Sequence, residues 1–135
     1  MDKETIESFA KYRLDRAKET LNTAENIYND GTDYTSANNR AYYAIVYSIR
    51  AVLALEEIDF KRHKDVLAYF NKQYVNTNIF PKNIGRKISQ AQRVREDSDY
   101  DDEFMPTAEK TKTQIDTAKE VIELVEKYIK EKSNN

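Results

Sequence analysis

Apolar side chains recur every three or four positions along most of this 135-residue sequence, which is the pattern of amphipathic helices. The spacing predicts a first helix over residues 3–29 and a second over residues 35–58. Asn29-Asp30-Gly31 ends the first helix, and Thr35 and Ser36 can accept hydrogen bonds from the free N–H groups that open the second. Because the loop between them is short, these two helices are expected to pack antiparallel.

The second segment is the organising element of the chain. Between residues 41 and 55 its strongly polar side chains are Ser48 and Arg50 alone, and a helix that is apolar nearly all round is a buried, central one. One of its faces is small and aliphatic and suits close helix packing. The opposite face, where we expect function, carries Asn39, Tyr43, Val46, Tyr47 and Arg50.

The rest of the chain predicts three further helices. A shorter one covers about residues 63–75, the next covers about 81–98 with Pro81 in its first turn, and the last covers about 107–132 with Thr107 as its N-cap. The sequence therefore predicts one all-α domain over residues 1–135: an up-and-down bundle of about five helices, three long and two short.

Composition supports this fold class and narrows the function. Two glycines and two prolines leave little material for hairpins, and the absence of cysteine excludes disulfides and thiolate metal sites. The start MDKETIESF is not a signal peptide, and no apolar run is long enough to span a membrane, so we expect a cytoplasmic protein that makes no membrane contact. A net charge of −2 argues against a DNA-coating protein but leaves room for a local basic patch.

Arg95 interrupts the buried stripe of the fourth helix, where Ile84, Ile88 and Ala91 precede it. An arginine on an apolar stripe needs a partner, because burying an unpaired charge is costly. One interpretation is structural: Arg95 pairs with Asp97, Asp99 or a tyrosine hydroxyl. The other is functional: its guanidinium binds a phosphate, whose oxygens match the fork of N–H groups.

His63 is the only histidine, so histidine chemistry within one chain depends on it. It lies in Lys61-Arg62-His63-Lys64, where neighbouring cations and the start of a helix should both lower its pKa. It is either a polar residue at a helix start or a functional imidazole. The carboxylates Asp99, Asp101, Asp102 and Glu103 lack the spacing of a cation-binding loop and are expected to form a solvated acidic loop, so no metal or other cofactor is predicted.

With these residues identified, the sequence resembles the HEPN domain superfamily, and most closely the small stand-alone UPF0332-type proteins of bacteria and archaea. The resemblance runs from about Asp33 to Tyr128. It rests on pieces in a fixed order, which are Ala37-Asn38-Asn39-Arg40-Ala41-Tyr42-Tyr43-Ala44, His63, Phe70-Asn71-Lys72, Phe80-Pro81-Lys82, Gly85-Arg86, and Arg95 followed by Asp99-Tyr100.

The resemblance implies a helical bundle that usually forms a homodimer, often beside a minimal nucleotidyltransferase in toxin–antitoxin or defence systems. Many members are metal-independent endoribonucleases with a signature of arginine, four to six residues, histidine and, one residue later, often tyrosine. Arg95 occupies the arginine position and Tyr100 the tyrosine position. The signature histidine is missing, and Asp99 stands near its place.

Two main hypotheses follow. In the first, the chain is a non-catalytic module that binds a nucleotidyltransferase partner, a nucleotide or RNA, through Asn39, Arg40, Tyr43, Tyr47, Arg50 and Tyr100. In the second, it is a ribonuclease toxin with a rearranged site, in which Arg95 binds the phosphate and His63 or Asp99 is the acid or base. A purely structural interaction protein is the third alternative.

Overall fold

The computed structural model describes residues 1–101 and 103–134, and within these residues the chain is all-α, as predicted. Asp102 of the expected acidic loop lies outside the described residues. Five α-helices and one short π-helix follow one another along the chain: α1 (Lys3–Asp30), α2 (Tyr34–Ala54), α3 (His63–Phe70), η1 (Asn71–Val75), α4 (Lys82–Tyr100) and α5 (Ala108–Ser133).

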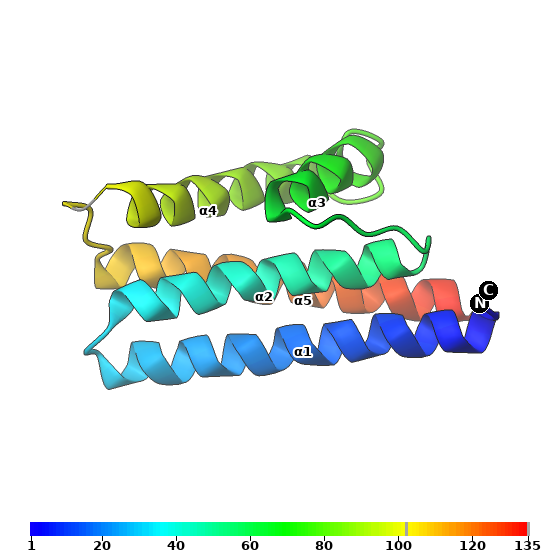
Figure 1. Ribbon diagram of the computed structural model, residues 1–135, viewed down its shortest axis with the longest axis horizontal. Helices are drawn as coiled ribbons and strands as arrows, with labels where there is room; N and C mark the ends of the chain where they lie inside the picture. The colour runs from blue at the N-terminus through cyan, green and yellow to red at the C-terminus, as the bar shows by residue number, and fades with distance from the viewer. Residues whose placement is uncertain (102, 135) are drawn as a thin grey trace.

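The long helices run up and down in a layered bundle (Figure 1). α1 and α2 form an antiparallel hairpin, and α5 runs alongside α2 in the same direction. α3, η1 and α4 lie on the other side of α2 and α5 from α1, and the two chain ends lie close together. α2 contacts α1, α3, α4 and α5, so it is the central helix that its composition predicted.

α2 and α5 each begin at a side-chain cap, and the cap of α2 is a different residue from the one predicted. Thr107 caps α5 as expected, because its Oγ1 accepts a hydrogen bond from the Lys110 N–H at 3.0 Å. α2 is capped by Asp33 rather than by Thr35 or Ser36: the Asp33 carboxylate accepts from the Ser36 N–H at 3.0 Å. A carboxylate cap also interacts favourably with the positive end of the helix dipole.

α2 ends at Ala54, four residues before the predicted end at Ile58. The Ile58 N–H donates to the Leu53 carbonyl at 3.1 Å, and the Glu57 N–H donates to the Ala54 carbonyl at 3.0 Å. These two bonds form a Schellman ending, in which Glu57 adopts a left-handed backbone with φ 58°. The sequence pattern missed this stop because glycine usually occupies that position.

Two other boundaries differ from the prediction. The segment 63–75 is not a uniform α-helix, since α3 changes to the wider η1 at Asn71, where the Asn76 N–H reaches back five residues to the Asn71 carbonyl at 2.9 Å. α4 continues to Tyr100. Asp99 therefore lies on the last turn of a helix and not in an acidic loop.

Burial within one chain is more complete than the sequence suggested. Ile45, Ile49, Val52 and Leu53 of α2 are fully buried, and so is Val46, which was expected on the opposite face with the tyrosines. α1, α3, α4 and α5 together cover these large aliphatic side chains of α2.

Gly85 of α4 packs directly against η1. A Cβ atom on Gly85 would lie 2.7 Å from Val75 Cγ1 and 3.2 Å from Asn71 Oδ1, and the Val75 side chain is buried. We predict that Gly85→Ala lowers the free energy of unfolding by about 1–3 kcal/mol through overpacking, measured by urea denaturation.

The double variant Gly85→Ala/Val75→Ala is the control for this prediction. Removing the Val75 methyl groups makes room for the new Cβ. The decrease in the free energy of unfolding of the double variant should therefore be smaller, by at least about 0.5 kcal/mol, than the sum of the decreases in the two single variants. A Gly85→Ala protein that is more stable than wild type would mean that helix propensity outweighs the contact.

Candidate phosphate-binding site

Tyr43 and Arg95 meet between α2 and α4. Arg95 Nη2 donates to the Tyr43 hydroxyl at 3.2 Å, and the Arg95 guanidinium lies 5.5 Å from the Tyr43 ring centroid and 5.7 Å from that of Tyr42. Arg95 also forms an ion pair with Asp99, one turn further along α4. The structural interpretation of Arg95 thus describes its partners correctly, since it has both an aspartate and a tyrosine hydroxyl.

His63, at the first turn of α3, packs against the same tyrosine. The imidazole ring centroid lies 5.1 Å from that of Tyr43 and 6.4 Å from that of Tyr42, with both pairs edge to face. Since Tyr43 contacts His63 through its ring and Arg95 through its hydroxyl, the fold brings together three residues that are far apart in the sequence.

Arg50 binds the segment that connects α2 to α3, and His63 is the first residue of α3. Its Nη1 donates to the Phe60 carbonyl at 2.8 Å and forms an ion pair with Asp59, while its Nη2 lies 3.4 Å from His63 Nδ1. Burial opposes ionisation of Asp59, but the Phe60 N–H, Arg13 and Arg50 outweigh it and lower the pKa of that carboxyl group. Arg50, predicted as a binding residue, is thus largely engaged in positioning α3.

Two titratable groups in this cluster have shifted pKa values. Burial lowers the pKa of His63 from its ordinary value, and the positive charges of Arg50 and Arg95 lower it further. Burial also raises the pKa of Tyr42 to about 12, so its hydroxyl stays protonated at neutral pH. A guanidinium group can only donate, so the contact from Arg50 requires His63 Nδ1 to accept, which leaves the proton of the neutral ring on Nε2.

The arginine–tyrosine contacts extend beyond this centre toward α1. The Arg40 guanidinium lies 4.8 Å from the Tyr43 ring centroid, and Tyr43 and Tyr47 are 6.1 Å apart. Arg16 of α1 lies 4.7 Å from the Tyr47 ring centroid and donates to the Tyr47 hydroxyl at 3.5 Å. The Asn39 side-chain oxygen also accepts from Arg40 at 3.4 Å. Four of the predicted binding residues on α2 therefore lie next to one another: Asn39, Arg40, Tyr43 and Tyr47.

Tyr100 is the predicted site residue that the fold leaves apart. It is the last residue of α4 and is 86% exposed. In the part of the chain that the structure describes, neither a hydrogen bond nor a ring contact joins Tyr100 to Arg95 or His63.

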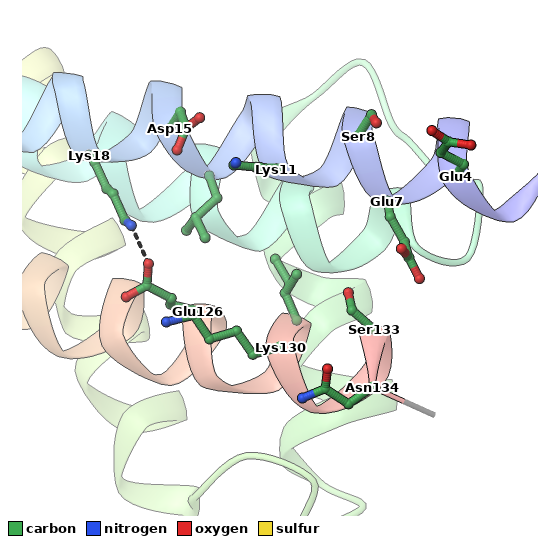
Figure 2. A pocket seen from close by; sticks show the side chains of 12 residues that line it. Glu4, Glu7, Ser8, Lys11, Asp15, Lys18, Glu126, Lys130, Ser133 and Asn134 are labelled. Carbon is green, nitrogen blue, oxygen red and sulfur yellow. Dashed lines mark hydrogen bonds and ion pairs between the residues drawn. The ribbon is translucent and has the colours of Figure 1, made fainter.

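A hollow of about 590 Å³ lies between α1 and α5, away from this cluster (Figure 2). Its walls carry charges of both signs, including Glu7, Lys11 and Lys130, and an ion pair between Lys18 and Glu126 crosses it. None of the predicted site residues lines this hollow. The residues that carry arginine, histidine and tyrosine chemistry lie at α2, α3 and α4.

Sequence reasoning missed Tyr42, Asp59 and Arg16 as members of this cluster. The sequence does carry a signal for Arg16, since it follows Tyr12 by four residues on one helix face. Over residues 1–101 and 103–134, the structure contains no group of three or more His, Asp or Glu side chains arranged to hold a metal ion.

This fold agrees with a comparison against protein-family models. The model of the HEPN domain matches residues 10–128, so the chain belongs to the HEPN domain family. Among the described residues, no helix combines the length and the apolar character needed to cross a membrane.

Three similar proteins come from a bacterium and an archaeon. A UPF0332 protein of Thermotoga maritima is 30% identical over 93% of this chain and 94% of its own length. Methanocaldococcus jannaschii has two: one named "Putative toxin MJ0605", 30% identical over 87% of each chain, and one named "Putative toxin MJ0142", 34% identical over 65% of this chain. The second match covers 59% of that protein's length.

The pKa of His63 gives a direct test of the geometry. As the only histidine, it can be followed by NMR, and we predict a midpoint below 6.5 in the folded protein. Arg50→Gln and Arg95→Gln should each raise that midpoint, while burial keeps it below 6.5 in both variants. Arg86→Gln, which removes an exposed charge from the other end of α4, should leave the midpoint unchanged.

The same shift predicts a pH dependence of stability. The folded chain releases the His63 proton more readily than the unfolded chain, so between the folded pKa and about 6.5 the unfolded state binds more protons. The contribution of His63 to stability is therefore complete above that window and is lost as the pH falls through it. A midpoint at or above 6.5 in wild type would contradict the described surroundings of His63.

Proposed function

We propose that this protein is a HEPN binding module whose Arg95 engages a phosphate group of single-stranded RNA or of a nucleotide, within a toxin–antitoxin or defence system. One observation carries the proposal: the half-buried Arg95 guanidinium already holds the carboxylate of Asp99 while Tyr43 fixes its orientation. Carboxylate and phosphate oxygens are the two acceptors that the guanidinium fork matches, so Asp99 occupies the place that a phosphate would take.

Arg95 has N–H groups to spare for such a ligand. A guanidinium carries five N–H donors, of which one goes to Tyr43 and the ion pair uses Nη1. Among the described residues, the buried Nε of Arg95 has no hydrogen-bond partner. Asp99 is more exposed than Arg95, with side-chain exposures of 39% and 19%, so a ligand can displace Asp99 toward solvent while Arg95 stays in place.

The state of His63 favours binding over catalysis. A general acid at neutral pH needs a protonated imidazole, and the lowered pKa of His63 works against that form. A general base needs a free ring nitrogen, but Nδ1 faces Arg50 and Nε2 carries the proton in the neutral ring. His63 in this setting is suited to donating one hydrogen bond to a ligand.

The wider context of the proposal comes from the relatives. Two of them carry the word toxin in their names, which supports a role in a toxin–antitoxin or defence system. A homodimer and a minimal nucleotidyltransferase partner belong to the proposal because the sequence resembles families in which both occur. Light scattering at micromolar concentration tests the dimer, and a clean monomer mass would remove it.

Binding to RNA is the first measurement. We expect wild type to bind a fluorescein-labelled 12-nucleotide single-stranded RNA, followed by anisotropy at fixed salt. Arg95→Ala should weaken binding at least about tenfold, since losing a charged hydrogen bond costs about 1.5–3 kcal/mol. Arg93→Ala removes the same charge from an exposed position of α4 and should change the Kd by no more than about twofold.

Asp99→Asn distinguishes a binding site from a structural ion pair. It removes the competing carboxylate, so RNA affinity should rise several-fold even if the protein loses a little stability. A folded Arg95→Ala protein with wild-type affinity, or an Asp99→Asn protein with weakened affinity, would place the RNA elsewhere. Circular dichroism confirms folding in each case.

A second candidate function is a metal-independent endoribonuclease with His63 in place of the missing signature histidine. The observation that favours it is the contact of His63 with Tyr43, which in turn holds Arg95. The binding proposal expects no cleavage of the same RNA in the presence of EDTA. Cleavage that falls by about 100-fold or more in both His63→Ala and Arg95→Ala would select the ribonuclease instead.

A further inference from the structure

A second hollow, of about 550 Å³, lies beside the arginine–tyrosine cluster between α1 and the start of α2. It is lined by Tyr12, Asp15, Arg16, Glu19, Thr20, Thr23 and Arg40. Tyr12 to Thr23 covers three turns of α1, a length of about 16 Å. Six of the seven residues belong to α1, a helix that the Arg95 site does not use.

The hollow and the Arg95 site share a wall of stacked side chains. Arg40 lines the hollow and lies 4.8 Å from the Tyr43 ring centroid, and the Tyr43 hydroxyl accepts from Arg95. On the other side, Arg16 lines the hollow and lies over the ring of Tyr47, which neighbours Tyr43 at 6.1 Å. One layer of tyrosine rings and guanidinium planes therefore separates a ligand in the hollow from the Arg95 site.

The charges of the hollow do not suit a bare phosphate. Arg16 and Arg40 bring two positive charges, and Asp15 and Glu19 bring two negative ones, so the lining has no excess of positive charge. The ligand it fits is one with flat faces and N–H groups. Nucleobases have both, and arginine planes and tyrosine rings are the surfaces on which unpaired RNA bases stack.

The threonines add acceptors for such a base. Thr20 Oγ1 donates to the Arg16 carbonyl at 2.8 Å, and Thr23 Oγ1 donates to the Glu19 carbonyl at 3.2 Å. Each hydroxyl has thereby used its only proton and presents lone pairs. With the carboxylates of Asp15 and Glu19, the wall offers acceptors to the amino and imino groups of a base.

We infer that this hollow is a nucleobase subsite for single-stranded RNA, holding a nucleotide next to the one whose phosphate engages Arg95. The inference rests on the proposed function and specifies its substrate class, because a mononucleotide fills only the Arg95 site whereas a strand of several nucleotides fills both. Tyr12, which is 58% exposed, is the stacking surface that remains open to solvent.

The test measures how well an unlabelled eight-nucleotide RNA and a mononucleotide each compete with a labelled eight-nucleotide RNA for binding. Tyr12→Ala and Arg16→Ala should each weaken binding of the eight-nucleotide RNA by about tenfold, which is within the range for losing one base–aromatic stack. Tyr12→Ala should bind a mononucleotide as wild type does. Tyr12→Phe keeps the ring and should keep the affinity, and Arg93→Ala is the matched charge control.

A photo-crosslink tests the contact itself, because a change in protein stability cannot produce a covalent adduct at Tyr12. An eight-nucleotide RNA carrying 5-iodouridine should, on irradiation, form a covalent adduct with the peptide that contains Tyr12, located by mass spectrometry. An adduct only on α3 or α4 would overturn the subsite.

The outcomes separate the two proposals. If Arg95→Ala weakens binding while Tyr12→Ala and Arg16→Ala bind the eight-nucleotide RNA as wild type does, the subsite is wrong and the Arg95 site stands. If wild type binds no RNA of either length, both fail. If Tyr12→Ala changes the mass in light scattering but not the RNA affinity, this surface is an interface between copies of the chain, and the subsite is wrong.

Discussion

The burial of α2 is the constraint on which the rest of the molecule depends. A helix that is apolar nearly all round is stable only if other helices cover it on several sides, and α1, α3, α4 and α5 do so. The polar-tipped residues of α2 can then lie only along the boundaries between the covering helices. Tyr43, Tyr47 and Arg50 occupy these boundaries, each half-buried, with an apolar body inside and a polar group at the edge.

Each boundary residue contacts a partner from a different segment of the chain. Tyr47 meets Arg16 of α1, Tyr43 meets Arg95 of α4, and Arg50 meets the connector to α3. Because a half-buried guanidinium needs a compensating acceptor, Arg95 pairs with Asp99, and Arg50 pairs with Asp59. The same two arginines lower the pKa of His63, so packing of the core and protonation of the candidate site are coupled.

The protein belongs to the HEPN domain family. The resemblance puts Arg95 at the arginine of the ribonuclease signature and Asp99 near the place of its histidine. The only histidine of the sequence, His63, enters the cluster from α3 with its Nδ1 facing Arg50. An imidazole held in this way is better suited to donating a hydrogen bond than to exchanging protons. The proposed binding of RNA, with Asp99 as a displaceable stand-in for phosphate, accounts for this arrangement without requiring proton transfer by His63.

The sequence by itself determined the fold class and most helix positions, because periodicity records which side of a helix is buried. It also marked Arg95, since a charge that interrupts an apolar stripe is visible in the chain. The end of α2 at Ala54 was missed, because Glu57 takes a backbone conformation that sequence patterns assign to glycine. The change from α3 to η1 was missed as well, since it arises where that segment packs closely against Gly85.

Only the tertiary structure decided which chemical groups meet. His63 and Arg95 are far apart in the sequence, and both reach Tyr43 because α3 and α4 pack on the same side of α2. Tyr100 was expected to belong to the site, yet it is the last residue of α4 and is exposed. Periodicity fixes which face of each helix is buried, but not how one helix is rotated and shifted against the next. That geometry depends on side-chain packing between segments distant in the chain.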